Sequence, residues 1–342
     1  MMDMKFAVGM GRNENIYQIS DLAKTAEDSG FNYVTFVDQP HISPDALVCM
    51  TLAIENTKRI HVAHGVTDHH TYHPSVTANA TACLNELSGG RAFVGIGTGN
   101  VGAKVTGISP FEELRDAILF IKKFSAGDEV EFQGLKWQSE WSRRPLRVYL
   151  GGTGPRLCQL AGEVADGIML TSNADPVLLK WQKEQVEIGA EKAGRDPSEV
   201  DIWARGMIYV TDTIGQAKRE VSGYAVNSAK VLSRLLRQKN PSIEDLRKRM
   251  VKAHPALIEE CERSFSQWRP EQHEKIDTPA ALAITQNILD IQHLVGKPDD
   301  ICEKLEIIRN LGIDTFATVT YTISDKKGMI QRIGEDIISK FN

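Results

Sequence analysis

The chain has 342 residues, of which 42% are hydrophobic and 25% charged, a composition typical of a soluble globular protein. Its formal net charge of −5 argues against a nucleic-acid-binding protein, which usually carries a basic surface patch. No apolar run reaches the roughly 18 residues that a membrane-spanning helix needs, so we expect no membrane partner either.

The cysteines and the N-terminus indicate the compartment in which the chain works. The five cysteines are scattered along the sequence and form no CxxC pair, so neither a zinc site nor a disulfide framework is expected. The first residues, MMDMKFAVGM, lack the charged and apolar regions of a secretory signal. We therefore expect a reduced, cytoplasmic protein.

Apolar runs alternate with segments of helical periodicity along most of the chain. Strands are predicted at 4–10, 33–37, 60–66, 92–96, 148–150, 167–170, 201–210 and 315–321. Helices are predicted at 21–29, 45–56, 75–87, 110–124, 156–164, 181–192, 297–310 and 329–340, and a loop or hairpin at 132–145. Strands that alternate with helices in this way are parallel and joined by crossovers. The pattern favours an α/β fold of the closed (β/α)8 TIM-barrel type, with an open doubly wound sheet as the alternative.

The alternation stops after the seventh predicted strand. Residues 213–293 are charged and mostly helical, with breaks at Asn240-Pro241 and Asp277-Thr278-Pro279. We interpret residues 1–342 as a single barrel domain in which 213–293 is a helical insertion. Long insertions in a barrel often serve as lids, so we expect these helices to cover the barrel mouth and shape the substrate pocket. A solvated helical decoration is the alternative interpretation.

The segment 148–171 reads VYLGGTGPRLCQLAGEVADGIMLT, which indicates a strand, a glycine turn, a helix and a second strand. Glycines in such a turn let backbone N–H groups approach a ligand closely, and a helix N-terminus attracts anions. Gly151, Gly152, Thr153 and Gly154 therefore form a candidate cradle for the phosphate of a cofactor. The turn matches neither a Walker loop nor the dinucleotide-binding fingerprint, and an ordinary tight turn is the alternative.

Polar residues also follow several other predicted strands. In a barrel the active site lies at the carboxyl ends of the strands. These ends read Asp38-Gln39-Pro40-His41, Thr67-Asp68-His69-His70, Thr98-Gly99-Asn100, Gly152-Thr153-Gly154 and Thr171-Ser172-Asn173. Small and hydrogen-bonding residues of this kind suit a large, planar, phosphorylated cofactor.

Two of these stretches resemble a known family. The segments GVTDHHTYHPSVTANATACLNELSGGRAFVGIGTGN (65–100) and VYLGGTGPRLCQLAGEVADGIML (148–170) are similar to motifs of the bacterial-luciferase-like superfamily of flavin- and coenzyme F420-dependent oxidoreductases. Within it, the chain resembles the branch like methylenetetrahydromethanopterin reductase. The similarity extends over most of the predicted barrel, whereas the insertion carries no matching motif.

The resemblance implies positions for the cofactor. The residues that it places around the flavin or deazaflavin ring are Asp38, Gly65, Val66, Thr67, Asp68, Thr98 and Gly99. The residues that it places around the phosphate are Gly151, Gly152, Thr153, Gly154, Gly167 and Ile168. Members of the family often have a cis non-proline peptide at the position of Gly65-Val66, behind the ring. Asp38 is expected to fix the cofactor rather than to carry a proton.

The chain also departs from the family pattern. Gln39 stands where deazaflavin-dependent dehydrogenases of the superfamily often have a histidine, and Asn100 stands where they often have a glutamate. The sequence Asp68-His69-His70 replaces the usual Asn-Pro-Tyr, and Tyr72 replaces an arginine. The changes at Gln39 and Asn100 argue against copying the family's acid–base mechanism to this chain, whereas the expected fold and cofactor pocket are largely untouched.

We predict that His41 and Asn100 are the catalytic residues, which contact the substrate next to the reacting ring atom. His41 is the nearest residue to Asp38 that exchanges a proton near neutral pH, although a loop histidine without a role is the alternative. Arg205, on the seventh predicted strand, either faces the cavity as the partner of an anion or pairs structurally. The clustered histidines form no ligand spacing such as HExxH, so we expect no metal site; they are His61, His64, His69, His70 and His73.

The sequence thus favours an oxidoreductase that transfers a hydride between coenzyme F420 and a small organic substrate. One alternative is a monooxygenase that uses reduced FMN and oxygen, because the ring of FMN and the ring of coenzyme F420 need the same kind of flat binding surface. A second is a flavin-binding protein without catalytic activity. In each case we expect a small-molecule partner, no nucleic acid or membrane, and a homodimer or higher homo-oligomer.

Overall fold

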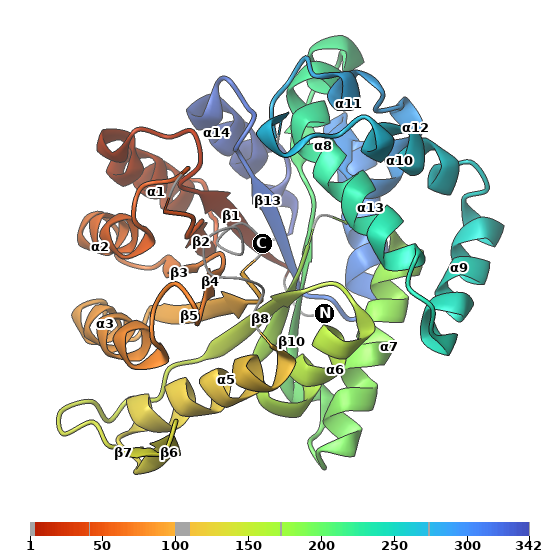
Figure 1. Ribbon diagram of the computed structural model, residues 1–342. Helices are drawn as coiled ribbons and strands as arrows, with labels where there is room; N and C mark the ends of the chain where they lie inside the picture. Colours follow the sequence, from red (N-terminus) through yellow and green to blue (C-terminus); the bar gives the residue numbers. More distant parts are fainter. Residues whose placement is uncertain (1–3, 41, 100–109, 172, 273, 342) are drawn as a thin grey trace.

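The computed structural model describes residues 4–40, 42–99, 110–171, 173–272 and 274–341. Eight parallel strands of this described chain form a closed barrel, whose hydrogen-bonded order is β3-β2-β1-β13-β10-β9-β8-β5, with β5 paired back to β3. They are β1 (Lys5–Met10), β2 (Tyr33–Phe36), β3 (His61–His64), β5 (Ala92–Gly97), β8 (Val148–Gly152), β9 (Gly167–Leu170), β10 (Asp201–Arg205) and β13 (Thr315–Val319). Figure 1 shows the strands at the centre and the helices around them. The predicted (β/α)8 barrel is confirmed.

Helices cover the outside of the barrel. They are α1 (Ile19–Asp28), α2 (Ala46–Asn56), α3 (Pro74–Leu87), α5 (Phe111–Ala126), α6 (Pro155–Val164), α7 (Pro176–Lys192), α13 (Pro298–Asn310) and α14 (Lys326–Asp336). Their ends follow from local chemistry. The Asp45 and Asp175 side chains accept hydrogen bonds from first-turn amides of α2 and α7, and Gly127 ends α5 in the left-handed conformation.

Shorter elements complete the described chain. The predicted loop or hairpin before the fifth barrel strand is a hairpin of β6 (Val130–Phe132) and β7 (Leu135–Trp137). Short 3₁₀ helices lie at Ile16–Gln18, Pro197–Glu199, Pro270–Gln272 and Ile338–Lys340. Searched over the residues that the structure describes, the chain has no helix with both the length and the apolar character needed to cross a bilayer.

The prediction of one continuous seventh strand is wrong. The strand β10 ends at Arg205, and β11 (Ile208–Val210) leaves the barrel to pair in parallel with β12 (Leu294–Gly296). The break is stabilised by two hydrogen bonds: the Met207 amide donates to Nδ1 of the buried His293, and the Ile208 amide donates to Thr318 Oγ1. A side chain from residue 293 cannot be foreseen at residue 207, so the apolar run looked continuous.

The predicted third strand is interrupted too. The strand β3 ends at His64, the Gly65-Val66 peptide bond is cis, and the two-residue strand β4 (Thr67–Asp68) then pairs with β5. The chain therefore changes direction where one strand from 60 to 66 was expected. This turn places residues 65–68 at the mouth of the barrel.

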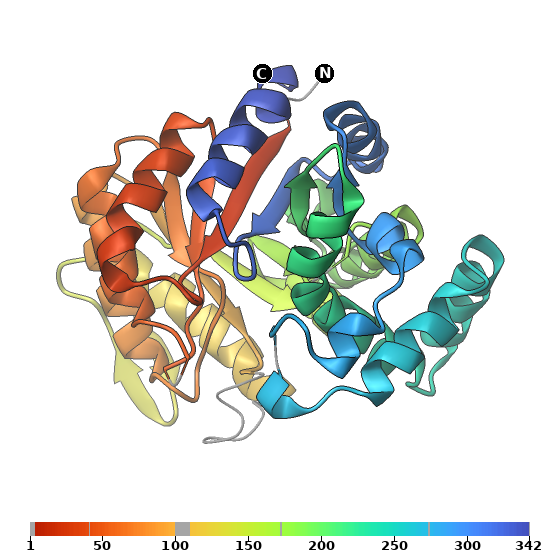
Figure 2. The same ribbon diagram turned by 90° about the horizontal axis from the view of Figure 1, so that it is seen from above.

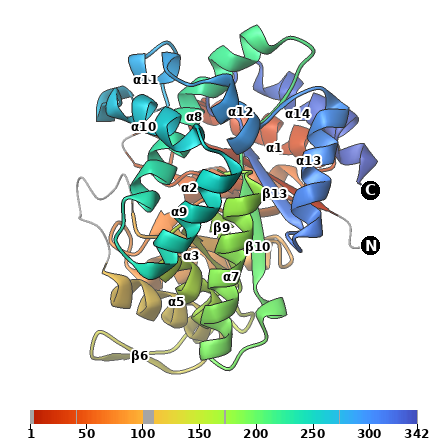
Figure 3. The same ribbon diagram turned by 90° about the vertical axis from the view of Figure 1, so that its right-hand side faces the viewer.

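Helices also fill the stretch between β11 and β12. They are α8 (Ile214–Leu236), α9 (Pro241–Ala253), α10 (Leu257–Ser266), α11 (Pro279–Leu282) and α12 (Gln286–Gln292). The long helix α8 contacts α9, α10, α11 and α12, while α9 packs on α7 of the barrel. Figures 2 and 3 show these helices as one group, coloured from green to blue, beside the barrel. The β11–β12 pair holds the two ends of this group together.

An aromatic layer fills the inside of the barrel. It consists of Ala7, Tyr33, Ala63, Phe93, Tyr149, Met169, Trp203 and Ala317, with Val66 packed on it. The Tyr149 hydroxyl (2.8 Å) and the Trp203 indole N–H (2.9 Å) both donate to Asp201 Oδ2, which satisfies the polar ends of two buried rings. This layer fills the barrel interior, so the barrel opens to a ligand at the carboxyl ends of its strands.

We predict that Trp203→Ala lowers the free energy of unfolding by about 3–5 kcal/mol, because it leaves a large cavity in the closed layer. Trp141→Ala is the matched control, since Trp141 is 48% exposed and Trp203 is 0% exposed. The control should cost less than about 1 kcal/mol. Urea unfolding of both variants measures the difference, and equal losses would contradict the assignment of Trp203 to the inner layer.

Candidate functional site

A cavity of about 340 Å³ opens at the carboxyl ends of the barrel strands. One side of it is lined by β4 and by residues at or just after the carboxyl ends of β1, β2, β3, β5, β8, β9, β10 and β13. Helix α8 lines the other side with residues between Tyr224 and Leu235, and Gln238 follows just after its end. The cavity therefore lies between the barrel mouth and the helices that follow β11.

The Val66 side chain forms a shelf on one side of this cavity. It is packed against the backbone of three glycines in the neighbouring strands. A Cβ atom added to Gly95, Gly97 or Gly151 would lie 3.1, 3.0 or 2.9 Å from a Val66 methyl group. Any larger residue at these positions would displace Val66. The sequence analysis assigned Gly151 to the phosphate, whereas the structure shows that Gly151, which also lines the cavity, makes room for the shelf.

Asp38 and Thr67 meet at the edge of the shelf. The Thr67 hydroxyl donates to Asp38 Oδ2 at 2.5 Å, and both side chains are buried. Burial, together with the nearby carboxylates of Asp45 and Asp68, raises the pKa of Asp38 to about 6, although the hydrogen bond from Thr67 acts in the opposite direction. Asp38 is thus a carboxyl group that titrates within about a unit of neutrality at the mouth of the barrel.

Asp68 lines the cavity, but its carboxylate accepts hydrogen bonds from neighbouring residues of the same turn. Its Oδ1 accepts from the amides of His70 (2.9 Å) and Thr71 (2.7 Å), and its Oδ2 accepts from the Thr71 hydroxyl (3.0 Å). Gly99, in the left-handed conformation, leaves room for this carboxylate, since an added Cβ would lie 3.0 Å from Asp68 Cγ. Asp68 therefore fixes the turn of residues 68–71 below the cavity wall.

The predicted phosphate cradle is an ordered turn between β8 and α6. Thr153 is fixed from behind, because its carbonyl accepts from Gln182 Nε2 of α7 (3.1 Å) and its hydroxyl is hydrogen-bonded to that of Thr171. A Cβ added to Gly154 would meet only a methyl of Leu235, at 4.0 Å. The turn is therefore open toward the cavity just before the N-terminus of α6, where backbone N–H groups attract anions.

The expectation that Gly167 and Ile168 flank the phosphate does not fit the structure. Both residues begin β9, at the end of the strand that points away from the cavity. A Cβ on Gly167 would clash with the Tyr149 ring at 2.4 Å, and Ile168 is fully buried. Thr171, at the other end of the strand, lies beside the cradle instead. The remaining cofactor residues, including Thr98, line the cavity, while His41 and Asn100 lie outside the described residues.

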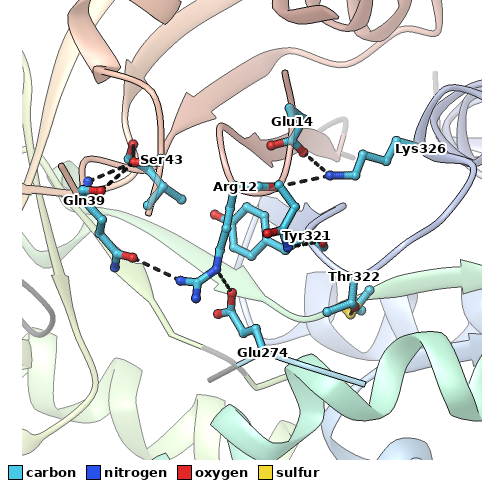
Figure 4. A network of polar contacts seen from close by, with 11 residues as sticks. Arg12, Glu14, Gln39, Ser43, Glu274, Tyr321, Thr322 and Lys326 are labelled. Atoms are coloured by element: carbon cyan, nitrogen blue, oxygen red, sulfur yellow. Dashed lines mark hydrogen bonds and ion pairs between the residues drawn. The ribbon is translucent and has the colours of Figure 1, made fainter. Parts of the chain in front are cut away.

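A chain of polar contacts centred on Arg12 crosses the mouth of the barrel (Figure 4). Arg12 Nη1 donates to Gln39 Oε1 at 3.0 Å, and Arg12 Nε lies 2.6 Å from Glu274 Oε2. Lys326 Nζ donates to Glu14 Oε1 (2.7 Å) and to the Arg12 carbonyl (3.1 Å). Gln39 thus holds an arginine that reaches the segment between α10 and α11.

Cations also line this side of the cavity. Arg205, the last residue of β10, is 6% exposed, and Lys230 of α8 is 4% exposed. Arg234 follows one turn later on α8. Burial lowers the pKa of Lys230 to about 8, and its Nζ lies 4.6 Å from the centre of the Trp268 ring. The sequence analysis left the direction of Arg205 open, and the structure shows that it faces the cavity.

Four residues at the cavity are not predicted from the sequence: Arg12, Lys230, Arg234 and Glu274. Arg12 lies two residues after the end of the first strand, so its position near a strand end was a usable signal. Glu274 and the α8 cations come from the segment 213–293, in which the sequence showed no recognised motif, and the tertiary packing of that segment on the mouth places them there.

His69, His70 and Glu113 come together outside the cavity. One ligand atom from each of the three side chains lies within 4.8 Å of the others. Sequence spacing could not show this group, because Glu113 is contributed by α5. The acidic member is exposed, with 59% of its side chain accessible.

The comparisons with known proteins agree with this architecture. The chain belongs to the luciferase-like monooxygenase family, whose family model matches residues 3–315. It is 27% identical to a 5,10-methylenetetrahydromethanopterin reductase of Archaeoglobus fulgidus, over 98% of this chain and 99% of that protein. It is 31% identical to an F420-dependent glucose-6-phosphate dehydrogenase of Microbacterium testaceum, over 54% of this chain and 61% of that protein.

Solved structures show the same fold. The F420-dependent tetrahydromethanopterin reductase of Methanopyrus kandleri aligns with a TM-score of 0.81 and 21% identity over all of both chains. An F420-dependent secondary alcohol dehydrogenase, in complex with an F420–acetone adduct, aligns with a TM-score of 0.75 and 19% identity over 98% of both chains.

The raised pKa of Asp38 leads to a prediction about stability. Between its ordinary value of 3.8 and about 6, the folded state binds more protons at this site than the unfolded state does. The contribution of Asp38 to stability therefore falls as the pH rises through this window. Asp38→Asn lacks the buried charge and still offers an oxygen to Thr67.

We predict that Asp38→Asn and the wild type have nearly the same free energy of unfolding at pH 4. Above pH 7 the free energy of unfolding of the variant should be higher than that of the wild type by about 2 kcal/mol. Denaturant unfolding of both proteins at a series of pH values measures this difference, because all other groups are shared. A difference that does not change with pH would show that Asp38 titrates normally.

Proposed function

We propose that the chain is an oxidoreductase that transfers a hydride between coenzyme F420 and a small organic substrate. The observation that carries this proposal is that a glycine cradle and a flat apolar shelf open into one cavity, as a phosphorylated planar cofactor requires. The full-length similarity to a methylenetetrahydromethanopterin reductase and the fold of two F420-dependent enzymes support it.

The residues of the site fit such a cofactor. The missing side chain of Gly154 leaves room for a phosphate in front of α6, and Thr153 offers a fixed backbone there. Val66 offers an apolar face for the ring, and Asp38 and Thr67 offer polar groups at the edge of that face. When bound, coenzyme F420 would supply the position that accepts or donates the hydride.

Asp38 is the described residue best suited to exchange a proton in this reaction. Its pKa of about 6 lets it hold a proton in mildly acidic solution and release it near neutrality. This assigns Asp38 a second role beside the fixing of the cofactor that the sequence analysis expected. His41 and Asn100 stay predictions from the sequence, with His41 next to this carboxyl group along the Asp38-Gln39-Pro40-His41 turn.

The second candidate function is a monooxygenase that uses reduced FMN and oxygen. The specific observation in its favour is the fold of a type II Baeyer–Villiger monooxygenase in complex with FMN, which aligns with a TM-score of 0.67 and 18% identity over 99% of both chains. The Val66 shelf suits the ring of either FMN or coenzyme F420, and the glycine cradle suits the phosphate of either cofactor. The cofactor therefore has to be identified by a binding measurement.

The same proposal includes the state of the protein in the cell. We propose a cytoplasmic homodimer or higher homo-oligomer that acts on a small molecule. The five cysteines are free in the structure, which is consistent with a reducing compartment. Light scattering on the purified protein measures the oligomeric state directly.

Fluorescence titration of the purified protein with coenzyme F420 and with FMN tests the proposed function. We expect F420 to bind at least ten times more tightly than FMN, which corresponds to about 1.4 kcal/mol. Tighter binding of FMN would favour the monooxygenase, and the absence of binding to both cofactors would overturn the proposal.

We predict that Gly154→Val weakens cofactor binding more than ten-fold, or by more than about 1.4 kcal/mol, because the new side chain fills the cradle. The Gly154 backbone has φ −80° and ψ 162°, which valine adopts readily, so the fold should be kept. Gly215→Val, where an added Cβ meets nothing within 4 Å, is the matched control. Unchanged affinity in a folded Gly154→Val protein would exclude the cradle as the phosphate site.

We predict that His41→Ala lowers kcat by roughly 10²–10⁴-fold, the usual effect of losing a general acid or base. Cofactor affinity should stay nearly unchanged, since the cradle and the shelf do not include this residue. Steady-state kinetics with the identified substrate measures the effect. Wild-type turnover in the variant would show that His41 is a loop residue without a catalytic role.

A further inference from the structure

The two sides of the cavity differ in chemistry. The side formed by β4, β5 and β8 presents glycines, Val66 and hydroxyl groups, as a ring and a phosphate cradle require. The side formed by the end of β10 and by α8 presents Arg205, Lys230 and Arg234. The proposed cofactor site occupies the first side and leaves these cations unused.

Arg205 is the most informative of the three cations. It is 6% exposed, and its Nε and Nη2 atoms are buried without a hydrogen-bond partner. Among the described residues, no acidic side chain forms an ion pair with it within 4.0 Å. Because a buried charge without a partner is costly, its retention at the wall of a cavity points to a partner that comes from outside the chain.

The surroundings of Arg205 add positive charge. Lys230 and Arg234 lie one turn apart on α8, and their cationic groups lie against the rings of Trp268 (4.6 Å) and Phe265 (5.4 Å). Of the carboxylates that line the cavity, Glu274 interacts with Arg205 and Lys230 and also forms the ion pair with Arg12, whereas Asp38 and Asp68 lie at the shelf. Among the described residues that line the cavity, this single carboxylate is shared by three cations, and Arg234 adds a fourth, so most of the positive charge on the β10–α8 side is not balanced by the chain itself.

We propose that Arg205, with Lys230 and Arg234, forms a subsite for an oxyanion of the substrate, a carboxylate or a phosphate. A guanidinium group with two unpaired N–H donors matches the two oxygens of either group. The inference deepens the proposed function and rests on it: the substrate is anionic, and its charged end lies on the side of the cavity away from Val66.

Calorimetric titration with inorganic phosphate and with malonate, at constant ionic strength, tests the subsite. The titrations use the protein without cofactor and the protein saturated with coenzyme F420. We expect Arg205→Gln to weaken binding of the preferred anion at least ten-fold and Arg205→Lys to weaken it less. Arg219→Gln is the matched control, because Arg219 lies on the same helix α8, outside the cavity, and pairs with the exposed Asp277.

A second measurement separates a binding role from a structural one. If Arg205 is an unpaired charge that awaits an anion, Arg205→Gln should raise the melting temperature of the anion-free protein. If Arg205 instead supports the fold, the same substitution lowers it. Lys230→Met, which should weaken anion binding several-fold, provides an independent variant should Arg205→Gln fail to fold.

The outcomes are distinguishable. Equal anion affinity in Arg205→Gln and Arg219→Gln, or no binding of either anion by the wild type at millimolar concentrations, overturns the inference. Loss of anion binding on saturation with F420 also overturns it, because the cations then belong to the acidic groups of the cofactor. A wild type that binds the anions through Arg205 but does not bind F420 overturns the proposed function and leaves the subsite standing.

Discussion

The contact between the Val66 side chain and the glycine backbone of two strands is the constraint on which the rest of the site depends. Val66 fits over Gly97 and Gly151 only because neither residue has a Cβ, and beneath it the barrel is filled by aromatic rings. With Val66 in this place, the chain turns out of β3 and brings Thr67 to Asp38. The shelf, the buried carboxyl group and the depth of the cavity thus follow from one packing contact.

The charged side of the cavity depends on a different feature, the break between β10 and β11. Because Met207 and Ile208 donate to side chains of His293 and Thr318, the chain leaves the barrel at Arg205. It pairs with β11 again at β12, after the helices that include α8, and re-enters the barrel at β13. The break therefore sets Arg205 at the cavity wall and lets α8 bring its cations over the same opening.

Much of the fold could be predicted, because two signals are local in the sequence: apolar runs that alternate with helical segments, and glycines that end helices. The cradle at Gly152–Gly154 was visible for the same reason, as a strand followed by glycines and a helix. Gly167 was misplaced because a motif gives the order of residues but not the end of the barrel at which they lie. The bridge from Gln39 through Arg12 to Glu274 joins residues 27 or more positions apart, and no local pattern records such a contact.

The central claim is that the cofactor lies on the glycine-lined side of the cavity and leaves the cationic side to the substrate. A crystal structure of the complex with coenzyme F420 tests it most directly. We expect the ring against Val66, with its edge toward Asp38, and the phosphate within hydrogen-bond distance of the backbone of Thr153 or Gly154. A phosphate bound by Arg205 and Lys230, with the ring against α8, would contradict the account.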